Sequence, residues 1–443
     1  MKNYALLGLV SVASGLAVAC GSTTVEPAPV VAAPPAADPA PQAPDPMAAT
    51  PMAPVLDHGN PSTTYPAFPP AMGQLRSNGG TVLKNPVIVT ITWPNDTRAS
   101  QLEQLGDTVG AGNYWSTVVS EYGALAAVSG APYHIHMTDA APASISDTAL
   151  ATLVQTSLAA TDGTAWPTPV SGEPIYIIYL PETTDLILQG KSACAQGVGG
   201  YHDSTTVNGH AVAYAIVPSC DTFDSVTLSA SHELAEAATD PYPQSRPAWS
   251  GFQDNDLAWD MFQQFQSENG DACEFYRDSD AAAGETDVMF TVQRLWSNKS
   301  AKAGHNPCVP AAKGEVYFNA TPLNLEDISA DLSALAGDAK GTDIQVTKGF
   351  KVAVGATRQI PLGFYSDGPM AAWTIKAVAG GIAGGHSSSS SVDLTLDVTD
   401  GQNGNKAYLS VTVNTAGKTN TELVTIVSTH AGTSHYMPIL IGN

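Results

Sequence analysis

A short stretch that begins at Ser229, SASHELAEAATDP, holds residue types that bind metal ions. His232 and Glu236 are four residues apart, so on a helix they lie on one face. This spacing places two ligands on one zinc ion in the H-E-x-x-H motif, and here Glu replaces the second histidine. A carboxylate oxygen is an accepted zinc ligand, and Glu233 occupies the position of the general base. The motif predicts a metal site, with zinc as the expected ion.

A zinc site needs a third ligand, for which several residues are candidates. Asp240 follows His232 by eight residues, or about 12 Å along a continuous helix, so it qualifies only if the chain turns sharply there. Glu268 and Asp271, in SENGDAC, are better candidates. His202, in GGYHDS, is a candidate for a ligand or for a group that stabilises an oxyanion.

A purely structural interpretation of the motif stays open. His232 and Glu236 would then form a satisfied polar pair on a half-buried helix. A second carboxylate in place of a histidine also makes a bound water less acidic, which favours weak hydrolytic power or none.

The elements that would position these residues belong to an α/β domain. Apolar, β-branched runs predict buried strands at 86–93, 174–180 and 210–218. The segment 99–123 has helical spacing, and the motif helix is expected to begin at Asp224 or Ser225 and to end before Pro241. We expect a zincin-like domain over residues 79–312.

Residues 313–443 have a different pattern. Alternating apolar and polar residues at 392–398, 407–413 and 422–428, separated by turns rich in Gly and Asn, predict an immunoglobulin-like β-sandwich. No catalytic cluster is evident in this part of the sequence. We expect an accessory domain that stabilises or adheres, with a flexible loop at GGIAGGHSSSSS.

The N-terminus predicts export. Residues 1–19 resemble a signal peptide, and LAVAC resembles a lipobox in which Cys20 carries the lipid that anchors the protein to a membrane. A plain secretory signal cleaved near Ala19 is the alternative. The segment 20–78, rich in Pro and Ala, is expected to be an extended tether.

The four cysteines other than Cys20 bear on the disulfides, and the net charge of the chain bears on its partners. The even number of cysteines in an exported chain predicts two disulfides, and of the three pairings we favour the sequential one, Cys194–Cys220 with Cys273–Cys308. The net charge of −23 argues against binding of nucleic acids.

Several segments in order resemble the EXORDIUM-like, or phosphate-induced, protein family. They are GGTVLKNPVIVTITWPND, NYWSTVVSEYG, IYIIYLPETTD, CAQGVGGYHDS with VAYAIVPSC, and SHELAEAATDP with ENGDAC. The last pair is similar to the non-plant members, which carry a His-Glu-x-x-Glu helix. The resemblance covers roughly residues 75–280. It implies that six candidate metal-site residues fall together on family motifs: His202, His232, Glu236, Asp240, Glu268 and Asp271. Plant members lack the His-Glu pair, and here Gly200-Tyr201 replaces the family's Gly-Trp.

The sequence is consistent with two functions. The first is a surface-anchored, zinc-dependent hydrolase of metallopeptidase type, located at the outer membrane or cell surface of a bacterium. The second is a non-catalytic lipoprotein that binds the cell wall or another surface. The expected partners are the membrane, through Cys20, and an extracellular polypeptide or glycan.

Overall fold

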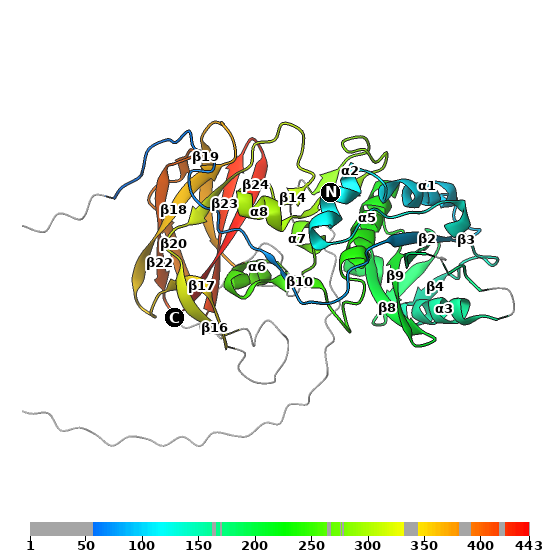
Figure 1. Ribbon diagram of the computed structural model, residues 1–443. Helices are drawn as coiled ribbons and strands as arrows, with labels where there is room; N and C mark the ends of the chain where they lie inside the picture. The colour runs from blue at the N-terminus through cyan, green and yellow to red at the C-terminus, as the bar shows by residue number, and fades with distance from the viewer. Residues whose placement is uncertain are drawn as a thin grey trace, which may run out of the picture. The chain divides into compact units, whose positions relative to one another are not determined.

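The computed structural model describes residues 56–442 except for 162–164, 169–170, 264–266, 275, 277–278, 332–343, 381–390 and 416–420. The predicted signal peptide, Cys20 and most of the predicted tether lie outside the described residues, as does most of the predicted loop GGIAGGHSSSSS. The described chain is mixed α/β with several sheets (Figure 1).

A five-stranded sheet forms the centre of the α/β region. Its strand order is β3 (His134–His136), β2 (Pro86–Thr92), β5 (Glu173–Tyr179), β9 (His210–Val217) and β8 (Tyr201–Val207). The first four strands are parallel, and β8 pairs antiparallel with β9 at the edge. The three predicted strands correspond to β2, β5 and β9. Every residue of β2 is buried, which explains why its sequence is an unbroken apolar and Thr run.

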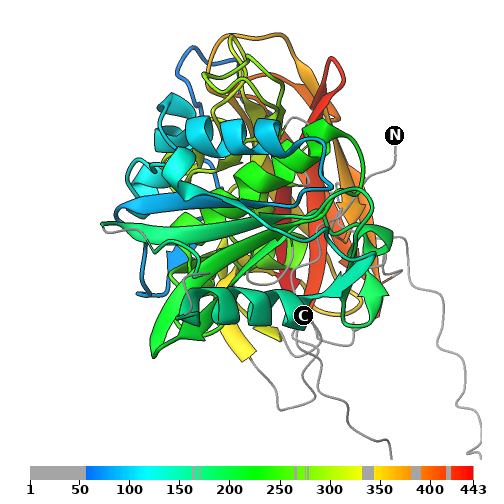
Figure 2. The ribbon, with the colours of Figure 1, turned by 90° about the vertical axis from the view of Figure 1, so that its right-hand side faces the viewer.

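Helices cover both faces of this sheet (Figure 2). The apolar core on one face contains α1 (Ala99–Val109), α2 (Asn113–Val119) and α5 (Phe223–Thr239), and the core on the other contains α3 (Asp147–Ala159). The helical segment predicted at 99–123 is two α-helices and a 3-10 turn rather than one helix. Gly110 and Gly112 fall at the break, where glycine weakens a helix.

The motif helix is α5, and it is more deeply buried than expected. Thr222 caps it, and its hydroxyl accepts a hydrogen bond from Ser225 N, so the predicted caps Asp224 and Ser225 already lie inside the helix. Every residue from Ser229 to Thr239 is buried. Small Ala residues along this stretch let the helix pack closely against the sheet.

Short elements complete the region. A three-stranded sheet consists of β4 (Ser144–Ser146), β6 (Asp185–Leu188) and β7 (Lys191–Ser192). The two-stranded pairs are β1 (Leu75–Ser77) with β10 (Trp249–Phe252), β11 (Asp280–Ala281) with β12 (Val292–Gln293), and β13 (Leu295–Trp296) with β14 (Cys308–Val309). The short helices are α4 (Ala193–Gln196), α6 (Leu257–Phe262), α7 (Asp271–Glu274), α8 (Asn298–Ala303), η1 (Ser120–Tyr122), η2 (Ala131–Tyr133) and η3 (Asp254–Asp256).

The last part of the predicted tether, residues 58–78, is packed against other elements rather than free as a spacer. Met72 and Leu75 are buried in the same apolar cluster as Trp259, and β1 pairs with β10. Larger apolar side chains become frequent in this stretch. Burying one of them removes more apolar surface from water than burying a Pro or Ala side chain of the preceding segment.

Two further sheets form the C-terminal region. The first has the order β15 (Phe318–Pro322), β18 (Thr357–Ser366), β22 (Lys406–Val413) and β20 (Val392–Leu396). The second has the order β16 (Glu326–Asp331), β17 (Ile344–Lys351), β24 (Thr433–Gly442), β23 (Thr421–His430), β19 (Trp373–Ala379) and β21 (Asp400–Gly401). Trp373 of the second sheet packs 5.5 Å from Phe318 and 5.5 Å from Phe364 of the first, so the two sheets share one core.

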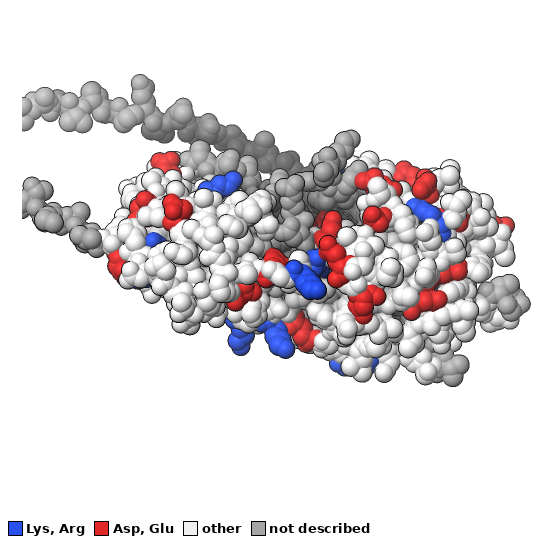
Figure 3. Space-filling model, turned by 90° about the horizontal axis from the view of Figure 1, so that it is seen from above, with Lys and Arg blue, Asp and Glu red and all other residues white. Residues whose placement is uncertain are grey.

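The cysteines form the two pairs that were predicted. The sulfur atoms of Cys194 and Cys220 lie 2.05 Å apart, and those of Cys273 and Cys308 lie 2.12 Å apart. Disulfides indicate an oxidising compartment such as the cell exterior or the periplasm. Within the described ranges, no helix has both the length and the apolar character to cross a membrane. On the face seen in Figure 3, acidic side chains are more numerous than basic ones, as expected from the net charge of −23.

Candidate metal centre

The helix α5 presents three polar side chains at the centre of the fold. The side chains of His232, Glu233 and Glu236 are 2%, 2% and 4% exposed. Burial of this extent is costly for ionisable groups unless they have partners. The partners come from three other segments, the start of β8, the segment 267–274 and β12.

The ring of His232 is held on both sides. Its Nε2 lies 3.0 Å from Glu236 Oε2, and its Nδ1 lies 2.7 Å from Oε1 of Gln293 on β12. The Gln293 amide nitrogen donates to the Gly270 carbonyl at 2.8 Å, which orients Oε1 toward the histidine. Because that oxygen only accepts, Nδ1 carries a hydrogen and Nε2 faces the carboxylates. Gln293 is not among the residues that the sequence indicates, because nothing in its local sequence marks it.

His202 joins the same cluster from the start of β8. Its Nδ1 lies 3.5 Å from Glu233 Oε2 and 3.5 Å from Glu236 Oε2. Its Nε2 donates to the backbone carbonyl of Asp240 at 3.1 Å and lies 3.4 Å from Glu268 Oε2. The sequence offered His202 as a ligand or an oxyanion-stabilising group, and the structure places it beside both carboxylates of α5.

Gly200, two residues before His202, passes close to Glu233. A Cβ at Gly200 would lie 2.8 Å from Glu233 Oε1, closer than real Cβ contacts. Glycine is required here because any side chain would push the carboxylate away.

The segment 267–274 closes the cluster from the other side. The backbone N–H groups of Gly270 and Asp271 donate to Glu236 Oε1 at 2.9 Å and 3.1 Å. A Cβ at Gly270 would lie 2.7 Å from His232 Nδ1, so this close approach also requires glycine. Asp271 Oδ1 lies 3.6 Å from His232 Nε2.

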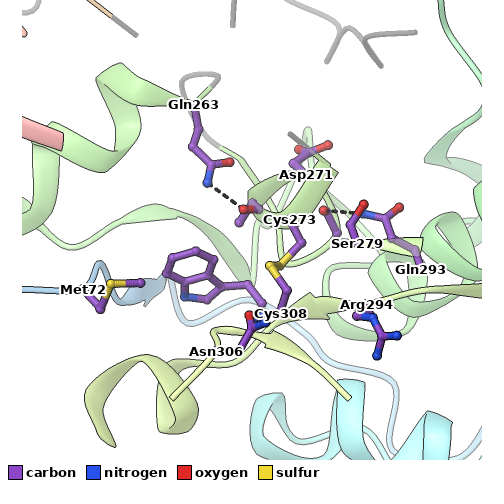
Figure 4. Close-up of a disulfide and its surroundings, with 12 residues drawn as sticks. Met72, Gln263, Asp271, Cys273, Ser279, Gln293, Arg294, Asn306 and Cys308 are labelled. Carbon is purple, nitrogen blue, oxygen red and sulfur yellow. Dashed lines mark hydrogen bonds between the residues drawn. A yellow bond between two sulfur atoms is a disulfide. The ribbon is translucent and has the colours of Figure 1, made fainter. Parts of the chain in front are cut away.

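A disulfide fastens this segment. Cys273, two residues after Asp271, is bonded to Cys308 of β14. Figure 4 shows the Asp271 carboxylate directed away from that bond. The Gln263 amide also donates to the Ala272 carbonyl at 2.6 Å. The turn that carries the candidate ligands is therefore cross-linked to the neighbouring strand pair.

Asp240 meets the cluster differently from the other candidates. It follows the last residue of α5, and its carboxylate Oδ1 accepts from Ala248 N at 2.7 Å. Its carbonyl oxygen, rather than its carboxylate, contacts His202. Burial raises the pKa of the Asp240 carboxyl to about 6.

The histidines and carboxylates alter each other's protonation. Burial lowers the pKa of His232 and of His202, but the surrounding carboxylates outweigh it and raise both pKa values well above the usual range. Burial raises the pKa of Glu236, yet the two histidines outweigh it and the pKa ends below its usual range. Burial and neighbouring carboxylates raise the pKa of Asp271 to about 7, and burial raises that of Glu268 well above its ordinary value.

Two overlapping groups have the composition of a metal site. The ligand atoms of His202, Glu236 and Glu268 lie within 4.8 Å of one another, and so do those of His232, Glu233 and Glu236. Imidazole nitrogen with carboxylate oxygen is a donor set that divalent transition metals accept. Glu268 Oε2 is buried without a hydrogen-bond donor among the described residues, as expected of an atom that accepts from a cation. These residues could therefore hold a metal ion.

In comparisons with known proteins, no family model matches this sequence, and no curated protein matches it either.

Proposed function

We propose that this protein is an exported, metal-dependent hydrolase of peptidase type that uses zinc. The observation that carries the proposal is the position of Glu236. One of its oxygens faces both histidines at 3.0 Å and 3.5 Å, while the other is fixed by two backbone N–H groups. A buried carboxylate oriented in this way, between two imidazoles, has the arrangement expected of a metal ligand. The resemblance to the EXORDIUM-like family supports the same residues, and a lipid anchor at Cys20 is part of the proposal.

Each residue has a role in this proposal. His232 and Glu236 would hold the ion, and Asp271, whose Oδ1 lies 3.6 Å from His232 Nε2, would be the third ligand. When bound, a divalent ion supplies Lewis acidity that polarises a carbonyl group and acidifies a water molecule. Glu233 would act as the proton acceptor, and the buried side chains around it would limit access of bulk solvent. Gln293 keeps His232 in the tautomer whose Nε2 faces the ion.

A peptide is the favoured substrate because the site adjoins a sheet edge. His202 lies on β8, which pairs with β9 on one side and ends the order of the five-stranded sheet. The backbone of such an edge strand can pair with an extended peptide.

The test separates the ligand from the base. The full chain, purified without chelators, should contain zinc and hydrolyse an unfolded protein such as casein. His232→Ala should lose zinc, and His210→Ala, at an exposed histidine on the neighbouring strand, should keep it. Glu233→Gln should retain zinc and lose hydrolysis, because the proton acceptor is removed.

Two results would overturn the proposal. Wild-type protein that takes up no zinc, even when zinc is offered, would favour the alternative of a non-catalytic surface-binding lipoprotein. Wild-type protein that binds zinc but hydrolyses casein no faster than Glu233→Gln would leave a metal-binding protein without the proposed peptidase activity.

A further inference from the structure

We infer that the centre binds two divalent metal ions that share Glu236, an inference that rests on the proposed metal-dependent function. The two groups of candidate ligands have only this residue in common. Each group also contains one histidine and another carboxylate. The centre is therefore built as two half-sites, His232 with Glu236 and His202 with Glu236, rather than as one set of ligands around one point.

The orientation of Glu236 suits a shared ligand. Its Oε1 accepts hydrogen bonds from Gly270 N and Asp271 N, which prevents the carboxylate from turning. Its Oε2 then faces His232 Nε2 at 3.0 Å and His202 Nδ1 at 3.5 Å. An oxygen held between two imidazoles is within reach of an ion bound to either of them.

The other carboxylates divide between the two half-sites. Asp271 Oδ1 lies 3.6 Å from His232 Nε2, and ligand atoms of Glu268, His202 and Glu236 lie within 4.8 Å of one another. Each histidine thus has its own carboxylate in addition to the shared one. Glu233 is buried beside both half-sites, 3.5 Å from His202 Nδ1, and stays available as the proton acceptor.

The balance of buried charge also favours two ions. In the described part of the chain, every ion pair of these four carboxyl groups is with His202 or His232, and none is with Lys or Arg. With neutral histidine ligands and all four of these carboxyl groups ionised, one divalent ion leaves two negative charges among them. Uncompensated buried charge is strongly destabilising. A second divalent ion brings the total for these four carboxylates and the two ions to zero.

The Glu268 oxygen that accepts no hydrogen bond from the described residues is a second observation that points to the second ion. Glu268 is 9% exposed, and its Oε2 has no hydrogen-bond donor among the described residues. An ion at the His202 half-site would give this oxygen the close partner that no hydrogen-bond donor of the described chain provides. The mixture of nitrogen and oxygen ligands in each half-site suits zinc, cobalt or manganese rather than calcium.

Metal stoichiometry tests the inference without measuring activity. The full chain, stripped of metal and titrated with Co²⁺, should bind two ions per chain, as counted by elemental analysis after removal of unbound metal. His202→Ala and His232→Ala should each bind one ion, and Glu236→Gln should weaken both sites. Glu268→Gln, which preserves size, should lower affinity at one site only. The control His210→Ala should bind two.

Each other outcome has a defined meaning. One ion per wild-type chain would overturn the two-ion centre and leave the proposed hydrolase intact. No bound ion would overturn both proposals. Two ions that persist in His202→Ala would show that the second ion lies elsewhere and would contradict the assignment. A Glu268→Gln variant with wild-type affinity at both sites would do the same, even if the His202 variant fails to fold.

Discussion

The buried histidines of the α/β region and the buried His435 of the paired C-terminal sheets have opposite surroundings. His202 and His232 each contact several carboxylates, which raise their pKa values well above the usual range although burial opposes this. His435, on β24, lies 4.4 Å from the ring of Tyr317 and 4.8 Å from that of Phe318. Burial lowers its pKa to about 3.

The contrast shows what burial alone does to an imidazole. Neither ring nitrogen of His435 has a hydrogen-bond partner among the described residues, and its closest carboxylate, on Glu315, is 4.0 Å away. It therefore remains neutral and acts as a flat core side chain. Where carboxylates surround the ring, as they do at His202 and His232, their attraction outweighs the effect of burial and favours the charged ring. A buried histidine indicates a site only when acidic partners accompany it.

The largest effect is expected from a substitution in the core of the C-terminal sheets. It should leave the charged cluster around α5 intact. Trp373→Ala removes the ring that packs between Phe318 and Phe364, so it should destabilise the protein by about 3–5 kcal/mol. Urea unfolding measures this loss. Metal bound per folded chain should not change at low temperature. A folded Trp373→Ala variant that binds no metal would show that metal binding depends on the core of the C-terminal sheets.

The next effect is on the pH dependence of stability, to which His435 and His232 should contribute with opposite sign. The unfolded chain protonates His435 below about pH 6.5, whereas the folded chain does so only near pH 3. The unfolded state thus binds more protons in that interval, and stability falls with decreasing pH by up to about 1.4 kcal/mol for each pH unit. His435→Phe should remove this loss, as measured by urea unfolding at pH 7 and pH 4.5.

His232 should give the opposite slope in metal-free protein. Because its folded pKa is raised, its contribution is complete below about pH 6.5 and is lost as pH rises through the folded pKa. The destabilisation by His232→Asn should therefore be larger at pH 5 than at pH 8. His210→Asn is the control for both experiments. Equal slopes for His435→Phe and His232→Asn would contradict the comparison.

A smaller effect is expected at Gln293, which orients His232. Gln293→Leu removes the acceptor for Nδ1, so metal affinity should fall by about 10- to 100-fold. Gln293→Glu keeps an acceptor for the histidine, although it loses the donor to Gly270 and adds a buried carboxyl group, so it should retain more of the affinity than Gln293→Leu. Competition with a coloured chelator measures both. If the two variants bind metal equally well, Gln293 does not set the tautomer.

The smallest effect is expected at Gly200. Alanine there places a methyl group 2.8 Å from Glu233 Oε1 and should displace the proton acceptor without removing a ligand. We expect hydrolysis to fall about tenfold while metal content stays constant. Gly368→Ala, whose Cβ would meet Val316 at an ordinary 3.5 Å, is the matched control. A loss of metal in Gly200→Ala would mean that Glu233 acts as a ligand.

Local sequence patterns determined the elements of this protein. Apolar runs identified β2, β5 and β9, and alternation identified β20, β22 and β23. The spacing of His232 and Glu236 identified the shared face of α5, because residues four apart meet on any α-helix. The favoured cysteine pairing, one of three that the sequence allows, is also the one in the structure.

The chain path decided what those elements bring together. The sequence named Glu268, Asp271 and His202 as candidates but could not place them, because an approach between segments so far apart depends on how β8 and the disulfide-linked turn pack on α5. Gln293 and the packing of Met72 and Leu75 likewise follow from tertiary contacts. The sequence alone determined which side chains can bind a metal ion, and only the fold could enclose them, because burial and mutual distance belong to the packed chain rather than to its local pattern.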